Sequence, residues 1–142
     1  MRIALAAVLA AAVLGSTSAM HGEILHYAVR LDAASETPSN ASKGLGAADV
    51  VLDTDARVLN WTITYSGLSG PVTMIHFHGP AAPGAAAAVT VPVGGPMASP
   101  VVGAAPLNDG QIGDVRAGLW YINLHTAANP KGEIRGQVAK AR

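Results

Sequence analysis

The chain has 142 residues, of which 50% are hydrophobic and only 13% are charged. Nine basic residues balance nine acidic residues, so the formal net charge is zero. Because no long run of either sign appears, a large nucleic-acid-binding surface and an electrostatic membrane anchor are excluded.

The opening of the chain predicts a secretory signal peptide over residues 1–19. Arg2 provides the positive start, residues 3–14 form an apolar run rich in alanine, and residues 15–19 supply small side chains at the cleavage positions. The apolar run is too short for a comfortable membrane span, and no later segment resembles one. We therefore expect an exported protein, periplasmic or secreted, whose single domain spans residues 20–142.

The lack of cysteine limits how this domain is stabilised. Small secreted domains often depend on disulfides, and a lipid-modified cysteine is excluded as well. The roughly 123 residues left after cleavage suit one domain with a modest core. A bound metal ion or self-association into a homo-oligomer is then the expected further source of stability.

The exported part of the sequence is predicted to be all-β. Apolar and polar residues alternate over residues 25–31 and 59–65, which is typical of half-buried strands. Glycine, proline, asparagine and aspartate mark the breaks between these and the other expected strands, which are 48–52, 72–78, 86–91, 119–125 and 133–138. Seven or eight short strands predict an antiparallel, Greek-key-like sandwich or barrel.

Residues 79–110 are rich in glycine, proline and alanine and poor in charge. We expect mostly loop here, with one strand at 86–91. No helix is expected outside the signal peptide, since prolines and glycines closely flank the alanine run. A loop this long in a compact domain is often functional, and it starts directly after His78. It either walls a site at that histidine or is a flexible surface excursion.

Three histidines are predicted to share the polar face of two strands. His76 and His78 are two residues apart in the strand 72–78, so both project to one side while the apolar residues beside them project to the other. His125 ends the strand 119–125, on the side opposite its apolar residues. If the two strands lie near each other, three neutral imidazoles converge as they do at a metal site. The alternative is that they are ordinary surface histidines.

Further ligands are available in the same sequence. His26 points away from the apolar face of its strand, as the other three do, and is the best candidate for a fourth ligand. His21 would be the third residue after cleavage behind Ser18, where an amino group, two amides and an imidazole can hold Cu(II). Met74 shares the histidine face of its strand and is either a soft axial contact or simple packing.

The polar neighbours of the histidines suggest how a metal would be supported. Glu133, Asn123 and Tyr121 are candidates for orienting the ligating imidazoles through their second ring nitrogen. Arg135, brought near His125 by a hairpin between the last two strands, could guide a small anion to the metal. The alternative for Glu133 and Arg135 is a solvated salt-bridge face.

Three stretches of the chain resemble the signature of a known family, the chordin-type (CHRD) domain. They are TMIHFHG at 73–79, GLWYINLHT at 118–126 and NPKGEIRGQ at 129–137, and Glu36, Pro38, Gly44 and Gly46 fit the start of that domain. The resemblance covers about residues 25–139. It implies an exported β-domain of a kind found in extracellular animal proteins and widely in bacteria, without a settled activity.

The His-x-His strand is also similar to the copper strand of Cu/Zn superoxide dismutases, which are β-barrels. This chain lacks their cysteines, an obvious bridging histidine and a zinc loop with aspartate. The similarity is therefore to copper-only enzymes of that type, and it favours copper as the cofactor.

Three functions remain open from the sequence. A copper site could dismute superoxide, with Arg135 guiding the anion, or handle copper without turnover. A zinc site could hydrolyse a substrate, with Glu133 as the general acid or base. A non-enzymatic binding or structural module could use the histidines as a stabilising metal clip.

Overall fold

The computed structural model describes residues 22–140, so the predicted signal peptide and His21 lie outside the described residues. Eight strands and one helix occur in this range. Their bounds are β1 Ile24–Asp32, β2 Leu45–Asp53, β3 Val58–Ser66, β4 Val72–His78, β5 Val89–Pro92, β6 Val101–Pro106, α1 Asp109–Arg116, β7 Trp120–Thr126 and β8 Ile134–Val138.

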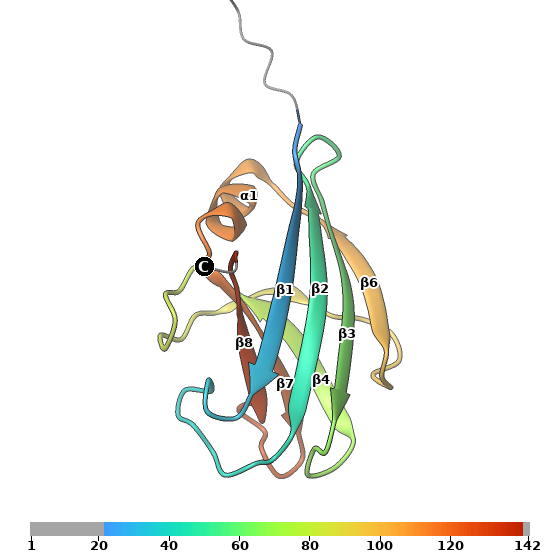
Figure 1. Ribbon diagram of the computed structural model, residues 1–142, viewed down its shortest axis with the longest axis vertical. Helices are drawn as coiled ribbons and strands as arrows, with labels where there is room; N and C mark the ends of the chain where they lie inside the picture. Colours follow the sequence, from blue (N-terminus) through green and yellow to red (C-terminus); the bar gives the residue numbers. More distant parts are fainter. Residues whose placement is uncertain (1–21, 141–142) are drawn as a thin grey trace, which may run out of the picture.

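All eight strands belong to one antiparallel sheet with the order β5-β4-β7-β8-β1-β2-β3-β6. The sheet curls into a nearly closed barrel, in which the long strands β1, β2 and β3 face the strands β4, β7 and β8 (Figure 1). The all-β, antiparallel, barrel-like prediction is confirmed. Strands β1 and β8 meet at the pair Asp32 and Arg135, which joins the two halves of the sheet.

The core fills the inside of this barrel because each strand turns its apolar residues inward. Phe77 lies at its centre, with its ring centroid 5.0 Å from that of Trp61 and 6.2 Å from that of Trp120. The apolar side predicted for β4 and β7 is fully buried, which applies to Ile75, Phe77, Trp120, Ile122 and Leu124. Their polar neighbours consequently lie on the outer face.

Two expectations about residues 79–110 were wrong or incomplete. This region contributes two strands, β5 and β6, instead of one. It also leads into the helix α1, although no helix was expected. Asn108 caps this helix by accepting a hydrogen bond from the amide of Gln111, whose side chain in turn accepts from the amide of Asn108. This capping box offsets the low helix propensity of the glycines inside α1.

The outer face of β7 is covered, so this strand is buried on both sides. The cover consists of the segments 33–40 and 79–88, named the outer loops below. The backbone of segment 79–88 forms hydrogen bonds with side chains of β4, β7 and β8. Segment 33–40 contributes the Thr37 hydroxyl, which accepts from Arg135 of β8. Within residues 22–140 there is no helix with the length and apolar character that a membrane crossing needs.

Candidate metal centre

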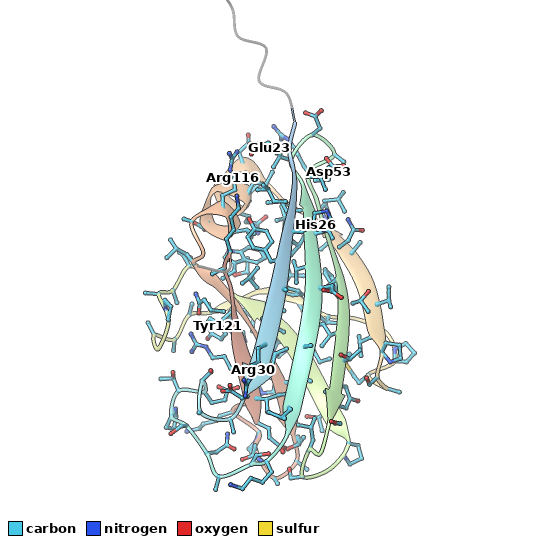
Figure 2. All side chains as sticks on the ribbon, in the orientation of Figure 1. Glu23, His26, Arg30, Asp53, Arg116 and Tyr121 are labelled. Carbon is cyan, nitrogen blue, oxygen red and sulfur yellow. The ribbon has the colours of Figure 1, made fainter. Side chains whose placement is uncertain are left out.

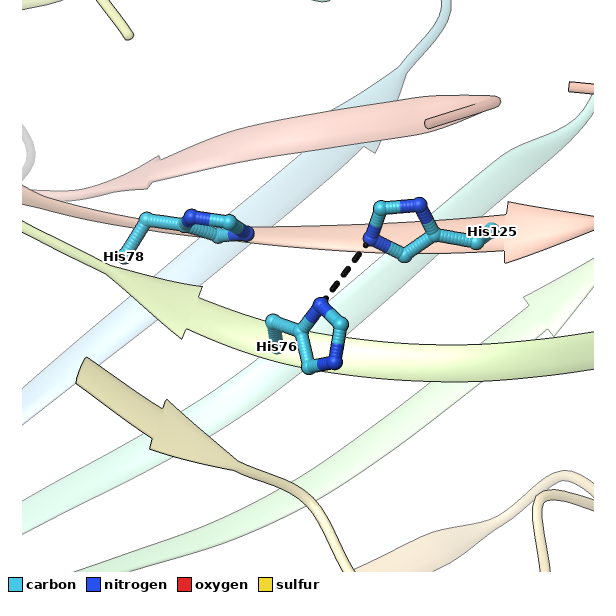
Figure 3. A group of neighbouring side chains, drawn as sticks. All are labelled: His76, His78 and His125. Carbon is cyan, nitrogen blue, oxygen red and sulfur yellow. Dashed lines mark hydrogen bonds between the residues drawn. The ribbon is translucent and has the colours of Figure 1, made fainter. Parts of the chain in front are cut away.

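The three predicted histidines come together because β4 and β7 are direct neighbours in the sheet. One ring nitrogen from each of His76, His78 and His125 falls within a group whose members all lie within 4.8 Å of one another. The rings point toward a common centre (Figure 3). Nδ1 of His76 and Nε2 of His125 are 3.2 Å apart, a separation that fits two nitrogens bound to one ion at about 2.0–2.1 Å.

Backbone carbonyls fix two of the three rings. Nδ1 of His78 lies 2.9 Å from the carbonyl oxygen of Ala87, and Nδ1 of His125 lies 3.0 Å from that of Pro130. A carbonyl oxygen only accepts hydrogen bonds, so Nδ1 of His125 carries the proton and its Nε2 keeps its lone pair. His78 has an oxygen acceptor at both ring nitrogens, so its Nε2 is free to bind a metal only when the Asn123 oxygen moves away. These orienting groups are backbone carbonyls in an outer loop and in the β7–β8 hairpin. They cannot be predicted from the residue types in the sequence, because every residue has a carbonyl group.

The environment keeps the rings in the form that binds metals. Burial lowers the pKa of the His76 imidazole, and the neighbouring His125 and His78 lower it further. Burial also lowers the pKa of His125, against the opposing effect of its hydrogen bond to the Pro130 carbonyl. Both rings are therefore neutral near pH 7, which is the state required of an imidazole ligand.

Two of the predicted orienting residues do lie against His78. The ring of Tyr121 is stacked parallel to the His78 imidazole, with centroids 4.7 Å apart and an angle of 3°. The Oδ1 atom of Asn123 is 3.0 Å from Nε2 of His78. Tyr121 limits the rotation of the ring, whereas Asn123 occupies the direction of approach of a metal, so an ion bound at Nε2 must displace that contact.

Arg135 is not placed to guide an anion from solvent. Its side chain is almost fully buried, and its guanidinium lies over the Tyr121 ring, 3.5 Å from the centroid. Because β7 lies between β4 and β8, Arg135 and His78 take opposite sides of Tyr121. The guanidinium donates to the Thr37 hydroxyl at 3.2 Å and to the Ala85 carbonyl at 2.8 Å. Arg135 thus fastens both outer loops to the sheet.

Glu133 is also separate from the three imidazoles. The carboxylate is fully buried, and its hydrogen-bond donors come from Ser42, Ser69 and Thr126. Burial alone would raise the pKa of Glu133, but these hydroxyl donors and the Ser69 amide lower it to about 2. Neither the predicted orienting role nor the general acid or base role has support in these contacts.

His26 does not join the group. Arg135 of β8 is paired with Asn123 of β7 on one side and with Asp32 of β1 on the other, so these three residues lie at the same level of the sheet. His26 is six residues before Asp32 on β1, which places it about 20 Å away along the strand. It is exposed near the start of β1, above Tyr121 in the view of Figure 2. The alternation of residues predicts the face of β1 on which His26 lies, but not its position along the strand relative to the other histidines.

Glu36, which the sequence indicates only through the resemblance to the CHRD domain, is a buried acid. Its Oε1 atom has no hydrogen-bond partner among the described residues. A Cβ atom added at Gly132 would overlap this oxygen, so the glycine is what allows the outer loop to approach. Burial raises the pKa of Glu36, although the Thr37 amide, the charge of Arg135 and the Asn123 amide oppose the rise.

Because the pKa of Glu36 is raised, folding disfavours its ionised form. We expect Glu36→Gln to keep or increase the free energy of unfolding at pH 7, by less than about 1 kcal/mol. Urea unfolding at pH 7 measures this. A loss of stability in the variant would contradict it, because the charge would then be a stabilising partner of Arg135.

The family model of the CHRD domain matches residues 27–138. This stretch runs from β1 to the end of β8 and contains all three histidines of the group. The match confirms the resemblance indicated by the three sequence motifs. No curated protein and no solved structure matches the chain.

Proposed function

This chain belongs to the CHRD domain family, and we propose that it is an exported copper-binding domain whose ligands are His76, His78 and His125. Domains of this family are typically extracellular, which agrees with the signal peptide predicted for residues 1–19. The observation that carries the proposal is the 3.2 Å approach of Nδ1 of His76 to Nε2 of His125, with a nitrogen of His78 in the same group.

The donor set favours copper. It consists of three imidazoles, and within residues 22–140 no carboxylate joins the group. Oxygen-rich sites suit magnesium, calcium and manganese, whereas imidazole suits copper and zinc. For a given set of nitrogen ligands the affinity of divalent ions is highest for Cu(II). A hydrolytic zinc site would need a general base beside the ion, and Glu133 is engaged elsewhere by three residues.

Copper supplies one-electron chemistry when bound, and superoxide is the small substrate that we propose for it. His76 is only partly buried, so this side of the site is open to a small molecule. Arg135 is not included in the proposal, because it lies behind Tyr121. Copper storage or delivery needs the same three ligands without turnover, and an assay of superoxide turnover by the loaded protein separates the two.

The test is to measure bound metals in the untagged, exported protein and in two histidine variants. We expect copper near one equivalent in the unmodified protein. His76→Ala should weaken copper binding by at least about 100-fold, since it removes a direct ligand. His76 is the most exposed of the three, so its loss disturbs the core least.

His26→Ala is the matched control, since it removes an exposed imidazole about 20 Å from the group. It should leave copper binding unchanged. Equal copper in all three proteins would contradict the proposed ligands. Stoichiometric zinc in place of copper would select the hydrolytic or structural alternative, and no metal after loading would leave a binding module.

A further inference from the structure

Met74 lies beside the three histidines because it shares the outer face of β4 with His76 and His78, directly after a bulge in this strand. The register between β4 and β7 shifts between Val72 and Met74, so Thr73 is an extra residue on β4. Val72 packs into the core, and after the bulge Met74 turns to the outer face. A β-bulge re-aims the side chains that follow it and is common near functional sites.

The new register pairs Met74 directly with His125. Residues opposite one another on antiparallel strands have Cβ atoms about 4.5–5.5 Å apart. Met74 is also two residues before His76, on the same face of β4. It therefore borders the pair His76 and His125 on the side away from His78.

The Met74 side chain has no packing role that explains its position. It is 43% exposed, whereas Met97, the other methionine among the described residues, packs against the core. Its three rotatable bonds let the thioether sulfur turn toward the imidazoles without moving the backbone. The three histidines leave room for a fourth ligand, and no carboxylate within residues 22–140 fills that place.

We propose that the thioether of Met74 is the fourth ligand of the copper site and that it makes the site selective for Cu(I). This inference rests on the copper site proposed above and adds the preferred oxidation state. Thioether is a soft ligand that selects Cu(I), while imidazole binds both oxidation states of copper and also zinc. Loss of the sulfur is therefore expected to weaken the binding of Cu(I) but not the binding of Cu(II) or Zn(II).

The test compares Cu(I), Cu(II) and Zn(II) binding by the exported protein with binding by Met74→Leu. Leucine keeps the size and apolar character of methionine at an exposed position, so the fold is retained. We expect Cu(I) affinity, measured against a chromophoric Cu(I) chelator under anaerobic conditions, to fall by at least about tenfold. Cu(II) and Zn(II) affinities should change by less than about twofold. The Cu(II)/Cu(I) reduction potential should fall in the variant.

Met97→Leu is the matched control and should leave all three affinities unchanged. X-ray absorption at the copper edge should show one sulfur neighbour in the unmodified protein and in Met97→Leu, and nitrogen neighbours alone in Met74→Leu. Cu(I) bound only by nitrogen in the unmodified protein would overturn the role of Met74 and leave the histidine site intact. Failure to bind either copper ion would overturn the proposed function itself.

Discussion

Replacing Glu133 by glutamine is expected to lower the free energy of unfolding by about 3 kcal/mol at pH 7. The carboxylate is fully buried and joins three parts of the chain that are far apart in sequence. Oε1 accepts from the Ser42 hydroxyl at 2.6 Å and the Ser69 amide at 2.7 Å, and Oε2 accepts from the Ser69 and Thr126 hydroxyls at 2.5 Å each. Glutamine removes the charge that strengthens these bonds and turns an N–H donor toward hydroxyl donors.

The pH dependence of this effect has a definite sign. The pKa of Glu133 in the folded protein, about 2, is below its ordinary value of 4.5. The contribution of Glu133 to the free energy of unfolding is therefore complete above pH 4.5. It is lost as the pH falls toward 2, since the carboxylate is then protonated in both the folded and the unfolded protein. The difference between the two pKa values corresponds to about 3 kcal/mol.

Urea unfolding at pH 7, 5 and 3, followed by tryptophan fluorescence, measures this prediction. The gap between the unmodified protein and Glu133→Gln should be largest at pH 7 and should shrink at pH 3. Glu36→Gln is the matched control, because it makes the same change at the other buried glutamate and is expected to cause no loss. Equal effects of the two substitutions would show that burial alone, and not the hydroxyl donors, determines the contribution of Glu133.

Gly136→Ala is expected to destabilise the protein by about 3 kcal/mol or more, because it forces two strands apart. An added Cβ atom would overlap the carbonyl oxygen of Arg30 and would come within 2.7 Å of Cγ1 of Val29. The backbone of β1 cannot yield without moving away from β8. Separating β1 from β8 would disturb the pair Asp32 and Arg135 and would expose buried side chains such as Val29.

Gly70→Ala provides the control for this substitution, since a Cβ atom there would meet no atom within 4 Å. Thermal and urea unfolding of the two variants should differ clearly, with Gly70→Ala close to the unmodified protein. If the free energy of unfolding of Gly136→Ala lay within about 0.5 kcal/mol of that of the unmodified protein, β1 and β8 would be able to separate without a measurable loss of stability.

The sequence predicts which face of its strand each side chain takes, but it does not predict which strands are adjacent in the sheet. The alternation around His76 and His78 predicted which side each residue takes, because the side-chain period of a strand is fixed. The adjacency of β4 and β7 had to be assumed, since β5, β6 and α1 lie between them in the chain. The same rule is not sufficient for His26, because periodicity gives the face on which a residue lies and not its position along the strand.

Some features were missed for other reasons. The capping box of Asn108 and Gln111 was present in the sequence and could have indicated α1. The carbonyl groups of Ala87 and Pro130 have no such signal, because any residue can supply a backbone oxygen. The burial of Arg135 depends on loops that fold over it, and their positions follow from tertiary contacts alone.

The unequal support of the three imidazoles bears on how quickly an ion would enter and leave. His78 and His125 are each fixed by a backbone carbonyl, while the one hydrogen-bond partner of His76 within the described residues is His125 itself. Dissociation would begin with rotation of the His76 ring, which is partly exposed and can open a coordination position to an incoming donor. The residence time of the ion would then be governed by one mobile side chain, while the two fixed nitrogens retain the geometry for rebinding.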